Sequence, residues 1–191
     1  MLVYSNMLAL GTQAPDFWLP DVDEKIWSLA DFSKSPALVV AFICNHCPFV
    51  HHVADGFAEF ARDYQDRNVA VVAISASDLE THSEDSPSEM RKFAAARGFT
   101  FPYLFDETQK SAIAYQASCT PDFYLFDAER RLVYRGQFDP SRPRNGLPVN
   151  GSSLRSALDA TLKGQPVTGE QTPSMGCSIK WKAGNEPEWA A

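Results

Sequence analysis

The chain has 191 residues, of which 45% are hydrophobic and 21% are charged, an ordinary composition for a globular protein. Disordered, collagen-like and coiled-coil structures are excluded, and the length suffices for one substantial core. The 24 acidic residues outnumber the 17 basic ones, giving a formal net charge of −7, which argues against nucleic acid as a partner. No apolar run reaches the roughly 18 residues of a membrane span, so we expect no membrane insertion.

The first half of the chain predicts a strand–helix–strand unit. Residues 1–36 are irregular, with short apolar pieces that predict a lead-in hairpin or short strands. The continuous apolar run 36–43 predicts a strand buried on both faces. Between Pro48 and Arg67, apolar residues recur every three or four positions, which predicts an amphipathic helix ending before Asn68. Residues 69–74 predict a second buried strand, parallel to the first.

The second half of the chain predicts shorter elements. A helix through Met90 and Phe93 ends at Gly98, and a long Pro- and Gly-rich loop covers residues 136–151. Ser152 or Ser153 is the expected N-cap of a last helix. The remaining elements are a short strand at 101–105, a short helix at 107–115 and a hairpin formed by 123–126 and 131–135.

Four cysteines are too few for a disulfide scaffold in a chain of this length. Cys44 and Cys47 are three positions apart, whereas Cys119 and Cys177 are isolated. The N-terminal residues lack the basic region and apolar run of an export signal, so we expect a cytoplasmic protein. In a reducing compartment, a close cysteine pair is typically catalytic or metal-binding.

The motif Cys44-Asn45-His46-Cys47-Pro48 lies where the predicted strand meets the predicted helix. A helix N-terminus and a protonated His46 would both favour a thiolate at Cys44, so we expect the pKa of this thiol to be lower than usual. The two-residue spacer allows the sulfurs to form a disulfide. Pro48 suits the first helical position because its missing N–H would be unpaired there. The motif therefore predicts a redox-active pair.

Metal binding is an alternative interpretation of the same region. Cys44 and Cys47, together with His46, His51 or His52, include residue types that bind zinc, and Cys47 and His51 share a helical face. The sequence has no second Cys-x-x-Cys or His-x-x-x-His to complete the site. Otherwise His51 and His52 are exposed helix residues near the active site, and no metal or cofactor is expected.

A buried strand, Cys-x-x-Cys-Pro, a long helix, a strand and a Thr-Pro before a hairpin resemble the thioredoxin superfamily. The lead-in at 14–21 and 27–32 is similar to that of its redoxin branch, the alkyl hydroperoxide reductase/thiol-specific antioxidant proteins. Residues 173–182 resemble the tail of a cytoplasmic thioredoxin-like subgroup with the same Cys-Asn-His-Cys-Pro sequence. The resemblance implies an α/β protein with a three-layer α/β/α fold, a mixed central sheet, an N-terminal hairpin and a C-terminal tail. Residues 1–163 would form the domain, and residues 164–191 would pack on it as the tail.

The resemblance also implies roles for individual residues. Cys44 matches the attacking cysteine, Cys47 the resolving cysteine, and Pro121 the cis-proline, while Thr120 before it would bind substrate through its backbone. The buried acid of thioredoxins is absent because Leu38 stands in its place. His46, water or a carboxylate from elsewhere would then accept the proton. His46 is similar to the histidine of periplasmic disulfide oxidases and would make the pair more oxidising.

Peroxidase activity is the close alternative, since redoxins include peroxiredoxins. Their motif places a proline seven residues and a threonine three residues before the reactive cysteine. Ala37 and Ala41 occupy these positions for Cys44, and the motif fails for Cys47 as well. Arg142 and Arg144 on the long loop are candidates for holding a peroxide, but solvated loop charges are the simpler interpretation.

The two isolated cysteines are candidate accessory thiols. Cys119 precedes Pro121 by two residues, and Cys177 lies on a tail that could fold back over the active site. One hypothesis is a relay in which either of them passes a disulfide to or from the Cys44–Cys47 pair. The alternative is that both pack as small hydrophobic residues.

The sequence as a whole predicts a thiol–disulfide oxidoreductase. Its substrates would be protein or small-molecule disulfides and thiols. A peroxiredoxin-like antioxidant peroxidase and a metal-binding module remain the alternatives.

Overall fold

The computed structural model describes residues 2–190 and is built around a five-stranded mixed sheet. In spatial order its strands are β6 (Tyr103–Phe105), β5 (Ala70–Ser75), β4 (Leu38–Phe42), β8 (Asp122–Phe126) and β9 (Leu132–Gly136). β4, β5 and β6 are parallel, whereas β8 pairs antiparallel with β4 and with β9. The predicted mixed sheet, parallel strand–helix–strand unit and C-terminal hairpin are confirmed.

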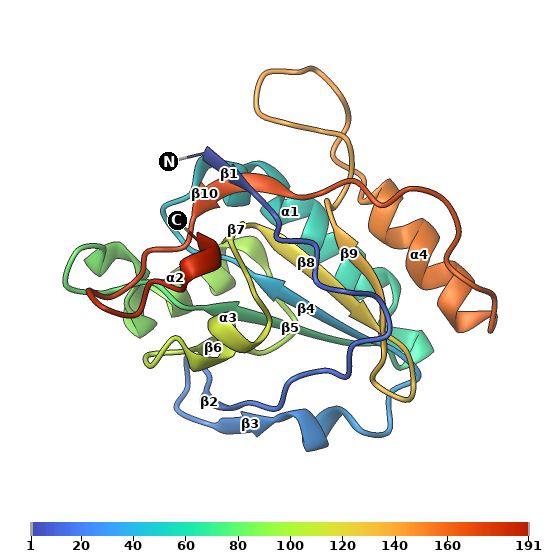
Figure 1. The fold of residues 1–191 in the computed structure, drawn as a ribbon, viewed down its shortest axis with the longest axis horizontal. Coiled ribbons are helices and arrows are strands. Elements are labelled where there is room, and N and C mark those ends of the chain that lie inside the picture. The colour runs from blue at the N-terminus through green and yellow to red at the C-terminus, as the bar shows by residue number, and fades with distance from the viewer. Residues whose placement is uncertain (1, 191) are drawn as a thin grey trace.

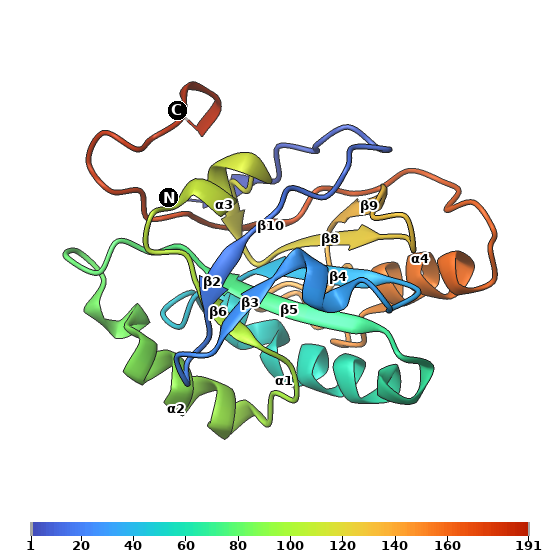
Figure 2. The ribbon, with the colours of Figure 1, turned by 90° about the horizontal axis from the view of Figure 1, so that it is seen from below.

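Helices cover both faces of this sheet (Figure 2). α1 (Pro48–Asp63) and α2 (Pro87–Arg97) lie on one face, and α3 (Lys110–Ala114) lies on the other. β4 is buried between two core clusters. Val39 and Ala41 pack in the cluster that also contains apolar residues of α1 and α4 (Ser152–Leu162). Leu38, Val40 and Phe42 pack in the cluster formed with α3 and the N-terminal segment.

The buried face of α1 follows the predicted apolar periodicity, with Phe57 at its centre. The Phe57 ring lies 5.1 Å from that of Phe101 and 5.3 Å from that of Phe123. The helix is shorter than predicted because Tyr64 leaves the helical conformation and a 3₁₀ turn follows at Gln65–Arg67. Asn68, with φ 55°, ends this segment in the left-handed conformation, which asparagine adopts more readily than most residues.

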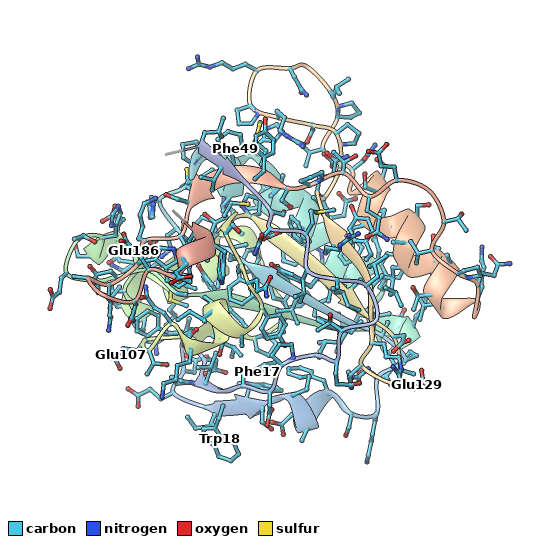
Figure 3. All side chains as sticks on the ribbon, in the orientation of Figure 1. Phe17, Trp18, Phe49, Glu107, Glu129 and Glu186 are labelled. Atoms are coloured by element: carbon cyan, nitrogen blue, oxygen red, sulfur yellow. The ribbon has the colours of Figure 1, made fainter. Side chains whose placement is uncertain are left out.

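The predicted N-terminal hairpin is present as β2 (Trp18–Pro20) and β3 (Ile26–Ser28). A 3₁₀ turn, Leu29–Phe32, connects it towards β4. Phe17 is 4% exposed and Trp18 is 75% exposed, and Figure 3 shows Phe17 directed into the molecule and Trp18 directed outward. The hairpin therefore covers one edge of the core with alternating inward and outward side chains.

A second sheet joins the two ends of the chain. β10 (Met175–Ser178) pairs antiparallel with β1 (Leu2–Tyr4) on one side and with β7 (Cys119–Thr120) on the other. Figure 1 shows β1 and β10 side by side near the beginning of α1. The segment after α4 thus supplies the central strand of this sheet, and Ile179 beyond it is buried.

The predicted serine cap of α4 is wrong. Ser152 and Ser153 both lie inside the helix, and the N-cap is Gly151 with φ 67°. The Asn150 side chain instead accepts a hydrogen bond from the Ser152 N–H at 3.0 Å. The buried carboxylate of Asp139 accepts from the backbone N–H groups of Asn150 and Gly151, which fixes the entry of the chain into α4.

The remaining 3₁₀ turns are Ser83–Asp85, before α2, and Glu188–Ala190, close to the C-terminus. Among the helices formed within residues 2–190, none has the length and apolarity needed to cross a membrane.

Candidate active site

The Cys-x-x-Cys motif connects the central strand β4 to α1, as predicted. Cys44 lies two residues after the end of β4, and Cys47 is the N-cap residue of α1. Pro48 occupies the first helical turn, where its missing N–H leaves no hydrogen bond unmade. The exposed fractions of Cys44 and Cys47 are 2% and 0%, so both thiols lie beneath the surface.

The segment containing Thr120 and Pro121 faces the two sulfurs, and the peptide bond between these residues is cis, as predicted. The Cys44 Sγ lies 3.2 Å from the Thr120 hydroxyl oxygen, within hydrogen-bond distance. The Cys47 Sγ lies 3.1 Å from the Thr120 carbonyl oxygen, to which Cys47 donates a hydrogen bond when it is protonated. The structure therefore brings the cysteine pair and Thr120 together.

The pKa values of the two thiols depend on each other, and the pKa of Cys44 shifts in the direction opposite to the prediction. A hydrogen bond from the Cys44 thiol lowers the pKa of Cys47 to about 4, and the Val50 N–H in the first turn of α1 also lowers it. The same hydrogen bond, followed by burial and the negative charge of Asp85, raises the pKa of Cys44 well above that of an ordinary thiol. The expected lowered pKa at Cys44 is therefore wrong for the reduced pair. The helix N-terminus favours the thiolate of the second cysteine, and the pair titrates as a unit.

His46 connects Cys44 to a buried carboxylate. Its Nε2 lies 3.9 Å from the Cys44 Sγ, and its Nδ1 lies 2.6 Å from Asp85 Oδ2. Burial opposes ionisation of Asp85, but hydrogen bonds from His46 and Ser77 hold its pKa below the usual value. An ionised carboxylate only accepts hydrogen bonds, so Nδ1 must be the donor. In the neutral form of the imidazole, the lone pair of Nε2 therefore faces Cys44.

Asp85 is the functional residue that the sequence analysis missed. Its side chain is fully buried, and its Oδ1 accepts hydrogen bonds from the backbone N–H groups of Asn45 at 2.6 Å and His46 at 3.3 Å. Leu38, at the position of the missing thioredoxin acid, is buried in the core. The carboxylate thus enters from another part of the chain, the 3₁₀ turn before α2.

The side chain of Asn45 also fixes the conformation of the Cys-x-x-Cys motif. Its amide nitrogen donates to the Glu84 carbonyl oxygen at 2.9 Å, and its Oδ1 accepts from the buried Tyr103 hydroxyl at 3.1 Å. Together with the bonds to Asp85, these contacts fix both residues between the two cysteines.

The other predicted histidines lie elsewhere. His51 Nδ1 contacts the guanidinium of Arg97 at 2.9 Å, and His52 Nε2 contacts the Ser141 hydroxyl at 3.0 Å. Within residues 2–190, the one grouping with metal-ligand character is Cys44, His46 and Asp85, whose donor atoms lie within 4.8 Å of one another. The structure therefore does not assemble the proposed ligand set with His51 and His52.

The loop arginines are also separate from the sulfurs. Arg142 donates to the backbone carbonyl oxygens of Asp139 and Ser141 and to the Gln137 side chain, and so stabilises its own loop. Arg144 is exposed farther along that loop, at φ 73°.

The two isolated cysteines differ in their relation to the pair. Cys119 is fully buried and donates to the Pro121 carbonyl oxygen at 3.7 Å. Cys177 is partly exposed and lies opposite Thr120 in the β7–β10 pairing. It packs against the cluster that contains both active-site cysteines, and its thiol and backbone N–H help to lower the pKa of Cys47. Cys177, and not Cys119, is therefore joined to the active-site pair.

Comparisons with known proteins agree with this architecture. Solved structures from Geobacillus kaustophilus (an uncharacterized conserved protein) and Sinorhizobium meliloti 1021 (a hypothetical protein) are 54% and 51% identical, each with a TM-score of 0.93. They cover 95% of this chain, and the aligned region spans 97% and 99% of those chains. The Chlorobium tepidum structure named "putative Thiol:disulfide interchange protein DsbE" is 22% identical with a TM-score of 0.65, over 81% of this chain and 99% of its own.

Curated relatives carry redox names. The Mycobacterium tuberculosis protein named "Putative peroxiredoxin Rv2521" is 31% identical over 59% of this chain and 67% of its own. The thioredoxin-like protein YneN of Bacillus subtilis is 30% identical over 61% of this chain and 65% of its own. Residues 10–135 match the AhpC/TSA family. With its thioredoxin-like fold and its cysteine pair at the end of the central strand, the chain belongs to the AhpC/TSA family, the redoxin branch of the thioredoxin superfamily.

Proposed function

We propose that the protein is a thiol–disulfide oxidoreductase in which Cys44 attacks a disulfide and Cys47 resolves the product. The observation that carries the proposal is the placement of the two Cys-x-x-Cys sulfurs at the start of α1, each within 3.2 Å of an oxygen atom of Thr120. A relative named thiol-disulfide oxidoreductase ResA, 26% identical over 68% of this chain, supports the same activity. Protein or small-molecule disulfides are the proposed substrates.

Cys44 is the better candidate for the first attack. The Cys47 sulfur is enclosed by the Thr120 carbonyl, Cys177 and the first turn of α1. Cys44 adjoins His46, whose side chain is 17% exposed, and so lies on the side open to an incoming substrate. As a disulfide approaches, the Cys44 proton passes to the Cys47 thiolate or to His46 Nε2.

The exchange then proceeds in two steps. The Cys44 thiolate forms a bond to one substrate sulfur, the substrate S–S bond breaks, and the other substrate sulfur leaves as a thiolate. Cys47 next attacks the Cys44 sulfur, forms the Cys44–Cys47 disulfide and releases the second substrate thiolate. The substrate gains two electrons and the cysteine pair loses them. The proton that Cys44 gave up passes to one released substrate thiolate, and the other thiolate takes a proton from solvent. The reverse sequence oxidises a substrate dithiol.

Trapping the intermediate tests this assignment. The Cys47→Ser variant should accumulate a mixed disulfide on Cys44 when it is mixed with oxidised glutathione, because the resolving thiol is missing. The Cys44→Ser variant should form no stable adduct at position 44, and Cys119→Ser should behave like the natural protein. Mass mapping of Cys47→Ser that finds Cys44 unmodified would contradict the proposal.

A peroxidase is the second candidate, supported by the family and by the relative named as a putative peroxiredoxin. Ala37 and Ala41 replace the peroxiredoxin proline and threonine, and within residues 2–190 no arginine hydrogen-bonds to the sulfur of Cys44 or Cys47. We therefore expect hydrogen peroxide to be consumed slowly compared with disulfide exchange. Rapid oxidation of Cys44 by equimolar peroxide, followed by intrinsic fluorescence, would favour the peroxidase.

A further inference from the structure

The resemblance predicts that the backbone of Thr120 binds an extended substrate. In the structure, strand β10 of the same chain already pairs with this backbone. In the antiparallel pairing of β7 with β10, Thr120 lies opposite Cys177, and Cys119 lies opposite Ser178. A Cβ atom on Gly176 would lie 2.0 Å from the Thr120 carbonyl oxygen. Glycine thus allows β10 to approach the Thr120–Pro121 segment more closely than any other residue would.

This strand places a third thiol against the active-site pair. The Cys47 Sγ lies 3.1 Å from the carbonyl oxygen of Thr120, the residue opposite Cys177. Helix α1, whose N-cap is Cys47, also contacts β10. Cys177 packs against the core cluster that contains Cys44 and Cys47, and its thiol and backbone N–H help to lower the pKa of Cys47. Cys44, Cys47 and Cys177 therefore form a series in which Cys47 is the shared neighbour.

The position of Cys119 excludes it from the series. Neighbouring residues of a strand point to opposite faces, so the side chain of Cys119 lies on the face opposite to that of Thr120. Consistent with this, the Cys119 thiol bonds to the Pro121 carbonyl and lies near the buried carboxyl of Asp122. Cys177 is also the most exposed of the four cysteines, since the other three are buried.

We propose that β10 acts as a built-in substrate strand and that Cys177 competes with Cys44 for a disulfide with Cys47. This inference rests on the proposed function, because it begins from the Cys44–Cys47 disulfide. The Cys177 thiolate attacks the Cys47 sulfur, the Cys47–Cys177 bond forms, and the Cys44–Cys47 bond breaks. Cys44 leaves as a thiolate and takes up the proton that Cys177 lost. The exchange moves the disulfide without net oxidation or reduction.

The exchange gives Cys44, Cys47 and Cys177 different chemical roles. It regenerates Cys44 for a further attack and transfers the oxidised state to a sulfur that solvent reaches. A dithiol reductant, small or carried by a protein, then reduces the Cys47–Cys177 disulfide by forming its own disulfide.

Disulfide mapping of the Cys44→Ser variant tests the proposal. In a glutathione buffer that fully oxidises the natural protein, this variant should form a Cys47–Cys177 disulfide, found as one linked peptide after non-reducing digestion. The double variant with Cys119→Ser should form the same link, and the double variant with Cys177→Ser should lose it. Free thiols at Cys47 and Cys177 in a folded Cys44→Ser protein would overturn the proposal.

The natural protein provides a second measurement if circular dichroism shows that Cys44→Ser does not fold. Oxidised natural protein should yield both the Cys44–Cys47 and the Cys47–Cys177 linked peptides. Finding the first link without the second would refute the exchange and leave the proposed function intact. Finding neither would refute the proposed function itself.

Discussion

Replacing Asp85 by asparagine should disable the base beside Cys44 while keeping the shape of the site. In the natural protein the carboxylate accepts the Nδ1 proton of His46, which leaves Nε2 facing Cys44 as an acceptor. An asparagine amide group at this position donates to Nδ1 and so moves the imidazole proton to Nε2. His46 then cannot accept the Cys44 proton.

Both the rate and the stability effects have a calculable size. A positioned general base contributes about 10²–10⁴-fold to a rate, and we expect at least 10²-fold in a Cys47→Ser background, because the Cys47 thiolate is absent there and cannot accept the proton instead. Loss of one charge-assisted hydrogen bond costs about 1.5–3 kcal/mol of unfolding free energy. Because the folded-state pKa of Asp85 is lowered from 3.8, this stabilisation is complete above that pH and is lost as the pH falls through the folded-state pKa.

Stopped-flow measurement of mixed-disulfide formation provides the assay. The Cys47→Ser protein and its Asp85→Asn derivative are mixed with an aromatic disulfide from pH 5 to pH 9, so that only attack by Cys44 is observed. Glu84→Gln is the matched control, since this exposed acid lies on the same turn. Equal rates and equal pH profiles for the parent and the Asp85→Asn derivative would refute the role of Asp85.

Three further predictions follow from the geometry. Gly176→Ala should lower the free energy of unfolding, measured in urea, by about 1–3 kcal/mol, because the added Cβ meets the Thr120 backbone. The control Gly56→Ala should lower it by less, because its Cβ meets only the end of the Val149 side chain. Equal losses of unfolding free energy would contradict the close approach of β10. Burial raises the pKa of Asp122 to about 6 from 3.8. Between pH 4 and pH 7 the natural protein should therefore lose about 2 kcal/mol of unfolding free energy relative to Asp122→Asn, and stability curves that stay parallel over this range would argue against the raised pKa. EDTA should leave the exchange rate unchanged, whereas a loss reversed by zinc would favour the metal-binding alternative.

The sequence predicts the central elements well because their signals are local. β4 and β5 are continuous apolar runs, and the face of α1 repeats with helical periodicity, so their burial follows from neighbouring residues. The position of the Cys44–Cys47 motif follows from the same boundaries. The cis peptide before Pro121 is confirmed, but it comes from the family resemblance and not from local physics.

The parts of the site that escape prediction depend on distant residues. Asp85 lies in a polar stretch with no periodicity, and only the fold brings it to His46. β10 is a four-residue segment with a glycine at its second position, too short and irregular to predict as a strand. Which of Cys44 and Cys47 has the lower pKa depends on which sulfur lies near the first N–H groups of α1. The position of each sulfur is set by the folded conformation of the loop, which the sequence does not reveal.

A redox titration of the natural protein tests the central claim most directly. The protein is equilibrated in glutathione buffers over roughly −120 to −300 mV, the thiols are alkylated with acid quenching, and the linked peptides are quantified by mass spectrometry. The account predicts a single two-electron transition with Cys44–Cys47 as the major disulfide. Cys44 and Cys47 that remain free thiols across the whole range would contradict it.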